Sequence, residues 1–471
     1  MKTYQDLVSL NEDEAKIKEF ILAAIREHQA SDVYKLAVKG EAYDKQENTT
    51  IMRYQKMLYT VTGKAIPDTI SANHKLASNY YNRFNVQENQ YLLGNGVTFN
   101  EASTKDKLGT KKKAFDTQLQ KLGKKALTHR VAFGFWNLDH IDVFDALEFV
   151  PLYDEEDGAI KAGIRYWQID TTKPLRATLY ELDGYTEYIR RPKEKDMEVY
   201  KPKRTYKYKI TYSEADGEIY EGENYPGFPI VPLWGNQDHV CKIKAWQPKI
   251  DCYDLIESGF ANDVDDASLI YWALENADGM DDVDLAQFIQ RLKTLHAAVM
   301  GEGAKATPHT QDVPVEARKT YLDLLEKDLY KDAMALDTEA IATGNTVATA
   351  IRAAYEPLNE KTDDFEYCVN EFIQGILEIA GIDDDPTFKR SIIVNQTEET
   401  TMVLSAAQYL DRETILKKLP FISPDEIDNI LDNLTKEEAE RFSADEEEDV
   451  DDGSGKETDG QETPEDGEES K

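Results

Sequence analysis

The chain has 471 residues and a formal net charge of −36, because 91 acidic residues stand against 55 basic ones. Proteins that grip nucleic acid do so with Lys and Arg against phosphate, so this composition excludes a nucleic-acid clamp and disfavours binding to an anionic membrane surface. The length predicts about two or three domains with sizeable cores. An aromatic content of 10% is typical of a folded protein.

The sequence carries no motif for catalysis, metal binding or membrane insertion. No apolar run reaches transmembrane length, and the first residues lack the basic and apolar regions of a signal peptide. The seven histidines have no metal-ligand spacing, and no serine lies in a nucleophile elbow. Cys241, Cys252 and Cys368 lie far apart, which favours free thiols in a reducing compartment. We therefore expect no enzyme, no metal and no cofactor.

Residues 1–90 are predicted to be helical, and Gly94-Asn95-Gly96 then turns the chain into a short strand at 97–99. A phosphate-binding loop is the alternative interpretation of this turn. It lacks the P-loop lysine and lies between helix and strand in the wrong order, so a plain turn is favoured. Residues 103–129 are predicted to form a helical segment that carries several lysines.

From about residue 131 to 234 the pattern changes to short strands separated by turns. The run 190–209 is basic and aromatic, which leaves two interpretations: a nucleic-acid patch or a solvated outer strand face. Lys207 and Lys209 alternate with Tyr206, Tyr208 and Ile210. This alternation favours the solvated face.

Two amphipathic helices follow. Apolar residues of the first recur at steps of three and four, with acids between them, so one face is predicted to pack while the other is acidic. The second begins near Pro314, a residue suited to a first helical turn. Two ordinary surface helices of a globular domain remain an alternative. The candidate packing and oligomerisation residues are Tyr253, Ile256, Phe260, Val264, Tyr271, Leu322, Leu325 and Leu329.

A third long helix is predicted from about Val347, with an apolar face that is interrupted by Pro357. Proline removes an internal hydrogen bond, so we expect a kink within one turn of Pro357. Near the C-terminus, residues 445–471 hold fourteen acids against two lysines and almost nothing apolar. Such a segment cannot bury enough surface to order itself, and 444–471 is predicted to be a disordered tail.

Five segments carry a family resemblance: Tyr91–Phe99, Phe149–Asp154, Pro226–Asn236, Asp254–Val264 and Val313–Lys319. In this order they resemble the bacteriophage portal proteins of the siphophage type, which form the head-to-tail connector. One departure is the loop 337–346, which has a single glycine, Gly344, where relatives often have more.

The resemblance implies an α+β portal fold with a mixed α/β wing, a helical stem, a small α/β clip, a long kinked helix and a helical crown, assembled as a ring. Carried over to this chain, the parts are the wing (1–245, with a β-rich part at 131–235), stem helix 1 (246–272), the clip (273–312), stem helix 2 (313–336), the channel loop (337–346), the long kinked helix and wing return (347–394) and the crown (395–443). The channel-loop residues are Asp337, Thr338, Glu339, Thr343, Gly344, Asn345 and Thr346.

The resemblance also implies partners and a location. The ring, usually of twelve subunits, would occupy one vertex of the capsid, contact the major capsid and scaffolding proteins, and anchor the head-completion or connector protein. Double-stranded DNA would be packaged through it by the terminase large subunit and later ejected, without sequence specificity. The chain would lie in the virion, and in the host cytoplasm during assembly, with no membrane partner. The alternative is a monomeric acidic scaffolding or adaptor protein of virion assembly.

Overall fold

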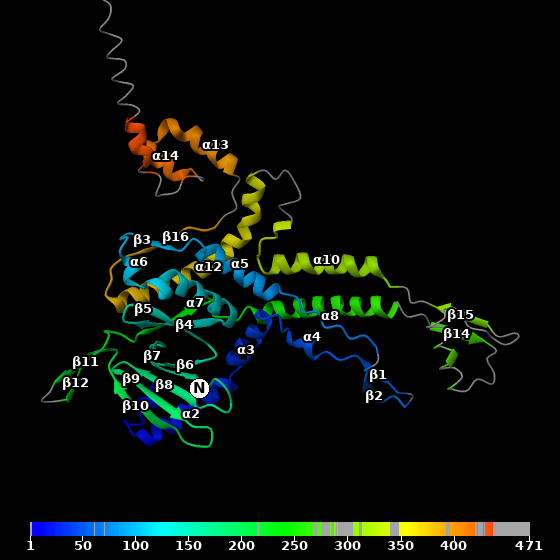
Figure 1. The fold of residues 1–471 in the computed structure, drawn as a ribbon, viewed down its shortest axis with the longest axis horizontal. Coiled ribbons are helices and arrows are strands. Elements are labelled where there is room, and N and C mark those ends of the chain that lie inside the picture. The colour runs from blue at the N-terminus through cyan, green and yellow to red at the C-terminus, as the bar shows by residue number, and fades with distance from the viewer. Residues whose placement is uncertain are drawn as a thin grey trace, which may run out of the picture. The chain divides into compact units, whose positions relative to one another are not determined.

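A computed structural model describes residues 2–60, 62–69, 71–213, 217–267, 271–275, 305–309, 313–339, 348–391, 396–419 and 429–436, with single positions at 283, 287, 288, 290, 422 and 427. The chain divides into two compact units, Met1–Ile392 and Ile393–Lys471. Helices and antiparallel sheets occur together in the first unit (Figure 1). The predicted α+β class is therefore confirmed.

A five-stranded antiparallel meander lies near the N-terminal helices, in the order β10-β9-β8-β7-β6. Helix α2 begins after Asp13, whose carboxylate accepts hydrogen bonds from the amides of Ala15 and Lys16, and it buries Ile21 and Ile25 in the same core as this sheet. The elements are α1 (Tyr4–Val8), α2 (Glu14–Ala30), α3 (Asp32–Asp44), α4 (Thr49–Arg53), β6 (Phe149–Tyr153), β7 (Ile160–Trp167), β8 (Leu175–Glu181), β9 (Gly184–Arg190) and β10 (Glu198–Arg204).

The basic run 190–209 contains the edge strand β10 and the start of a hairpin, β11 (Lys207–Ser213) with β12 (Gly217–Glu223). Lys201 lies 2.8 Å from a carboxylate oxygen of Glu187, and Lys203 lies 2.6 Å from one of Asp183. These lysines are thus neutralised by acids on and beside the adjacent strand. The arrangement agrees with a solvated strand face.

The larger core surrounds a three-stranded sheet in the order β13-β4-β5. Helix α7 packs on β4 and β5, and α12 packs on β13 and β4. The fit is close at Gly134 of β4, where a Cβ atom would lie 2.5 Å from the ring of Phe372. The elements are α5 (Tyr80–Leu93), β3 (Val97–Phe99), α6 (Thr104–Lys107), a 3-10 turn (Lys111–Lys113), α7 (Phe115–His129), β4 (Val131–Asn137), β5 (His140–Asp145), β13 (Ile230–Trp234), α12 (Ala348–Ala380) and β16 (Pro386–Phe388), which pairs with β3.

Two helices, α8 (Ile243–Ala267) and α10 (Val315–Asp332), lie side by side and extend from this body (Figure 1). We call them the stem pair. Beyond their outer ends β14 (Tyr271–Glu275) pairs with β15 (Lys305–His309), and Tyr271 lies opposite His309. The prediction of one helix over 246–272 is therefore wrong at its end. Helix α8 stops at Ala267, and Tyr271 belongs to a strand because the ladder with β15 supplies its backbone partners.

A small hairpin, β1 (Met57–Tyr59) with β2 (Ala65–Pro67), follows α4 on the side of α8 away from α10 (Figure 1). The second unit, taken by itself, contains α13 (Gln396–Ala406), a 3-10 turn (Ala407–Tyr409) and α14 (Arg412–Lys418). Among the described helices, none combines the length and apolarity needed to cross a membrane. The three cysteines are free thiols, as predicted.

Candidate functional site

The stem pair is joined along one face of α8. A groove of about 410 Å³ lies between the two helices, lined by Leu255, Ile256, Gly259, Ala317, Arg318 and Tyr321. Arg318 forms an ion pair with Asp263, and Lys249 lies 2.6 Å from a carboxylate oxygen of Asp332. The ion pairs thus connect the two helices near the outer end and near the body.

A second face of α8 is polar and buried. Asp254, Ser258 and Asn262 recur every four residues and accept hydrogen bonds from the amides of Ser78 (2.9 Å), Leu76 (2.9 Å) and His74 (2.6 Å). Four helical residues rise about 6 Å, and two extended residues span about 6.6 Å, so the two repeats match. This polar stripe therefore fixes the extended segment 74–78 along the helix.

The expectation that the acidic face of α8 lies away from packing is wrong for two carboxylates. Asp254 is fully buried and also accepts a 2.6 Å hydrogen bond from the amide of Asn48. Asp251 accepts hydrogen bonds from the hydroxyls of Tyr43 and Thr50. Burial raises the pKa of Asp254, while the bonds from Ser78 and Asn48 lower it. All of these donors are neutral, so they do not compensate the carboxylate charges.

The third face of α8 carries the predicted apolar stripe. Tyr253 packs edge-on against Tyr80 at 5.1 Å between ring centroids. Further out, Ile256 and Phe260 are only half-buried, and Val264 is 51% exposed. The stripe is therefore covered near the body and progressively uncovered toward the outer end of the helix.

Helix α10 also carries both covered and uncovered apolar side chains. Leu325 and Leu329 are buried and Leu322 is half-buried, whereas Tyr321 and Leu324 are 45% and 52% exposed. A contiguous exposed patch of large apolar side chains is rare on a soluble monomer and usually marks an interaction site. The stem pair thus offers apolar surface that the single chain does not cover.

An aromatic cluster anchors the stem pair to the body. The ring of Phe84 in α5 lies 5.5 Å from that of Trp246 in α8 and 5.4 Å from that of Tyr330 in α10. Edge-to-face pairs of this kind add about 0.5–1.5 kcal/mol each beyond the burial of their area. The cluster therefore joins both stem helices to the same helix of the body.

A buried charge cluster lies at the same junction. The carboxylate of Glu88 in α5 is fully buried and lies 2.6 Å from Nζ of Lys242, just before α8, and 2.8 Å from Nζ of Lys361 in α12. Burial lowers the pKa of Lys361 to about 8, although Glu88 opposes the shift. Two ammonium groups thus share one carboxylate where three elements meet. Sequence reasoning missed this cluster.

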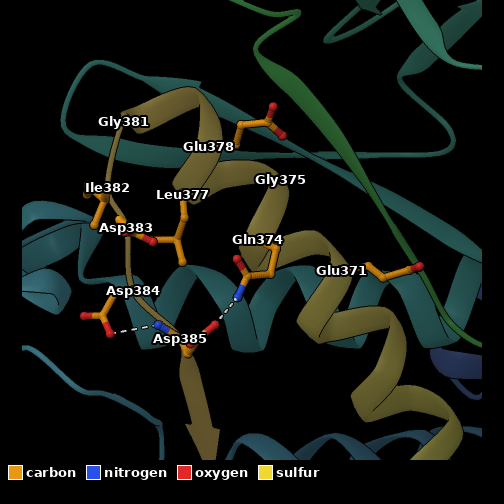
Figure 2. Close-up of a pocket in the computed structure, with 10 residues that line it drawn as sticks. All are labelled: Glu371, Gln374, Gly375, Leu377, Glu378, Gly381, Ile382, Asp383, Asp384 and Asp385. Atoms are coloured by element: carbon orange, nitrogen blue, oxygen red, sulfur yellow. Dashed lines mark hydrogen bonds between the residues drawn. The ribbon is translucent and has the colours of Figure 1, made fainter.

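An acidic groove of about 680 Å³ lies at the C-terminal end of α12 (Figure 2). Asp384 accepts hydrogen bonds from the hydroxyl of Thr104 at 2.6 Å and from the amides of Asn100 and Glu101. These bonds, first that from Thr104, lower the pKa of Asp384. Asp384 is thus a structural acceptor that fixes the loop after α12. In the described part of the chain no group of His, Cys, Asp and Glu is arranged to hold a metal ion.

Residues 38–452 match the model of a protein family described as "Phage portal protein, SPP1 Gp6-like". The chain belongs to this family. It is 24% identical to the portal protein of Clostridium phage phiCD119 over 295 residues, which cover 59% of this chain and 63% of that protein. It is also 24% identical to the portal protein of Bacillus phage SPP1 over 426 residues, which cover 83% of this chain and 81% of that protein.

Solved structures give weaker matches. The chain resembles one in the virion of a native gene transfer agent particle with a TM-score of 0.42 and 11% identity, covering 73% of this chain and 90% of that one. A chain in the neck of the native particle, computed with C12 symmetry, matches with a TM-score of 0.43 and 11% identity over the same shares.

Part of the predicted channel loop of this portal protein is described. Leu336 exchanges hydrogen bonds with the side chain of Gln87, at 2.8 and 2.9 Å, which fixes the start of the loop to α5. Asp337 then accepts a 3.0 Å hydrogen bond from the amide of Glu339, and Thr338 and Glu339 are exposed. The remaining residues of the prediction, Thr343, Gly344, Asn345 and Thr346, lie outside the described residues.

Pro357 lies inside α12, which is assigned as one helix from Ala348 to Ala380. Proline leaves the carbonyl of Ala353 without its helical amide partner. The kink stays a prediction. Most of the predicted clip and the whole acidic tail lie outside the described residues.

Proposed function

We propose that the chain assembles into a ring of twelve subunits at one capsid vertex. Double-stranded DNA passes through its axis, inward when the terminase large subunit packages it and outward at ejection. The ring contacts the major capsid and scaffolding proteins in the host cytoplasm during assembly and anchors the head-completion or connector protein in the virion. Membership of the portal family supports this proposal, which needs no catalytic step, no cofactor and no membrane.

The observation that supports assembly into a ring is the uncovered apolar surface of the stem pair. Phe260 and Val264 on α8, with Tyr321 and Leu324 on α10, are half-buried or exposed in the single chain. Fully burying an exposed side chain of this size contributes about 1.5–3 kcal/mol. Contact between the stem pair and the neighbouring subunit would provide this burial at every subunit boundary.

The charge of the chain suits a passage better than a binding site. Twelve copies of a chain with net charge −36 carry −432 in total, twelve times −36. An acidic wall repels phosphate and creates no deep minimum in which DNA would stop. The same charge opposes assembly, so the subunit contacts must offset it. In this proposal the loop 337–346 touches DNA transiently and without reading bases.

The mass of the purified chain in solution tests the ring. A particle of about twelve times 53.6 kDa is expected, with a ring visible in electron micrographs. A species of 53.6 kDa at every concentration would instead support the monomeric scaffolding or adaptor protein.

A matched pair of variants tests the stem contact. Val264 and Val8 are 51% and 55% exposed, but only Val264 lies on the stem pair. Val264→Ser should lower the fraction of chains in rings, and Val8→Ser should leave it unchanged. Equal ring fractions for both variants would contradict the role given to the stem.

A further inference from the structure

The hairpin β1–β2 differs in composition from the rest of this acidic chain. Residues 49–67 contain Arg53, Lys56 and Lys64 and no acidic residue. Both strands are exposed along their whole length, and Tyr59 is 76% exposed. An exposed strand pair that combines apolar and cationic side chains has the character of an interaction surface.

The hairpin is held on a defined side of α8. The chain after the hairpin continues into the extended segment 74–78, which binds Asp254, Ser258 and Asn262. In this segment His74 also lies 2.5 Å from a carboxylate oxygen of Asp265. Lys75, after the hairpin, donates a 2.7 Å hydrogen bond to the carbonyl of Met52, which lies in α4 before the hairpin. The hairpin therefore projects from the polar face of the helix.

The apolar stripe of α8 lies nearly opposite. Successive helical residues are about 100° apart, so Phe260 is about 160° from Ser258 around the axis, and Val264 is about 160° from Asn262. Glu257 lies on the same face as Phe260 and Val264, at helical spacings of three and seven. In the single chain the hairpin is attached on the polar face, and Val264 of the stripe remains 51% exposed.

The charge of the stripe is complementary to that of the hairpin. Residues 250–267 contain six acids and no basic residue, and the carboxylates of Asp251 and Asp254 are held by neutral donors. Glu257 is half-buried, and burial followed by the nearby Asp254 raises its pKa. Burial and Asp254 thus disfavour the ionised form of Glu257, and a cation placed beside Glu257 would stabilise that form.

We propose that the β1–β2 hairpin of one subunit docks on the Glu257–Phe260–Val264 stripe of the next. Leu58 packs on Phe260 and Val264, and Lys64 pairs with Glu257. Both side chains project from the same face of the hairpin, because Leu58 lies opposite Ile66 and Lys64 is two residues before Ile66. The two surfaces are different patches of the same chain, as a head-to-tail contact requires. The proposal rests on the ring proposed above.

Charge reversal tests the pairing. Lys64 is exposed on the hairpin, and Lys193 is an exposed lysine in the β9–β10 connection that serves as the control. Lys64→Glu should raise the chain concentration at half-assembly about tenfold, and Lys193→Glu should leave it unchanged. Adding Glu257→Lys to Lys64→Glu should restore assembly, because the ion pair is re-formed with its signs exchanged.

Leu58→Ala tests the apolar part, because Leu58 is 42% exposed and can be changed without disturbing the core. It should weaken assembly at low and high salt alike, whereas the effect of Lys64→Glu should shrink at high salt. A zero-length carboxyl–amine cross-linker on mixed light and 15N-labelled chains should join Lys64 of one chain to Glu257 of another.

The outcomes separate the hairpin contact from the ring itself. A wild-type chain that never assembles overturns both. Wild-type rings that tolerate Lys64→Glu and Leu58→Ala, and give no Lys64–Glu257 cross-link between chains, overturn the hairpin contact alone. Loss of assembly in Lys64→Glu without rescue by Glu257→Lys would show that the hairpin docks on a surface other than the Glu257–Phe260–Val264 stripe.

Discussion

Replacing Glu88 with Gln should destabilise the protein more than any exposed acid-to-amide change. Glu88 is fully buried between Nζ of Lys242 at 2.6 Å and Nζ of Lys361 at 2.8 Å. The glutamine keeps the volume and removes the only carboxylate of this cluster. Two ammonium groups then share a poorly solvated site without a counter-charge.

The magnitude follows from the geometry. Removing one partner from a buried ion pair costs about 3–5 kcal/mol, since the remaining charge is left uncompensated. Lys361 already has its pKa lowered to about 8, so part of the cost is relieved if it loses its proton. We expect Glu88→Gln to lower the free energy of unfolding by about 3 kcal/mol at pH 7.

Urea unfolding followed by tryptophan fluorescence measures this change, because the ring of Trp246 lies 5.1 Å from Nζ of Lys361. Two variants serve as controls. Glu378→Gln alters an exposed acid and should change stability by less than about 0.5 kcal/mol. Lys361→Met leaves one cation with one carboxylate and should cost far less than Glu88→Gln. Equal midpoints for Glu88→Gln and wild type would refute the reasoning.

The folded-state pKa of Lys361 is about 8, below its ordinary value of 10.5, so only the unfolded chain keeps that proton between the two values. The free energy of unfolding should therefore rise with pH above 8, by up to about 1.4 kcal/mol per pH unit. Urea titrations of the wild type and of Lys361→Met at several pH values measure this, and a difference in unfolding free energy that does not change with pH would contradict it. Pro357→Ala should restore a helical hydrogen bond and straighten α12, which an electron microscopy map of the ring would show; an unchanged helix path would remove the proline from the explanation. Truncation after Ala444 should leave the oligomer size unchanged by mass measurement, whereas a lost ring would assign the acidic tail a role in assembly. Replacing Asp337 and Glu339 with Lys should leave rings intact and slow DNA packaging in an in vitro assay, and a native rate would contradict contact between this loop and DNA.

Local pattern predicted several parts of the stem pair well. The apolar repeat located both helices, and Pro314 marked the start of α10, which begins at Val315. It failed at Tyr271, because the helical repeat continues past the residue where α8 ends. There the strand β15, more than thirty residues later, supplies hydrogen bonds that override the repeat.

The sequence by itself determined the acidic charge, the free thiols, the α+β class and the order of segments that resembles the portal family, because each depends on composition or on neighbours along the chain. Only the tertiary structure decided which acids are buried. Asp254 bonds to Asn48, 206 positions away, and Lys242 bonds to Glu88, 154 positions away. A carboxylate looks the same in sequence whether water or a distant donor solvates it, so its burial depends on contacts that no local pattern encodes.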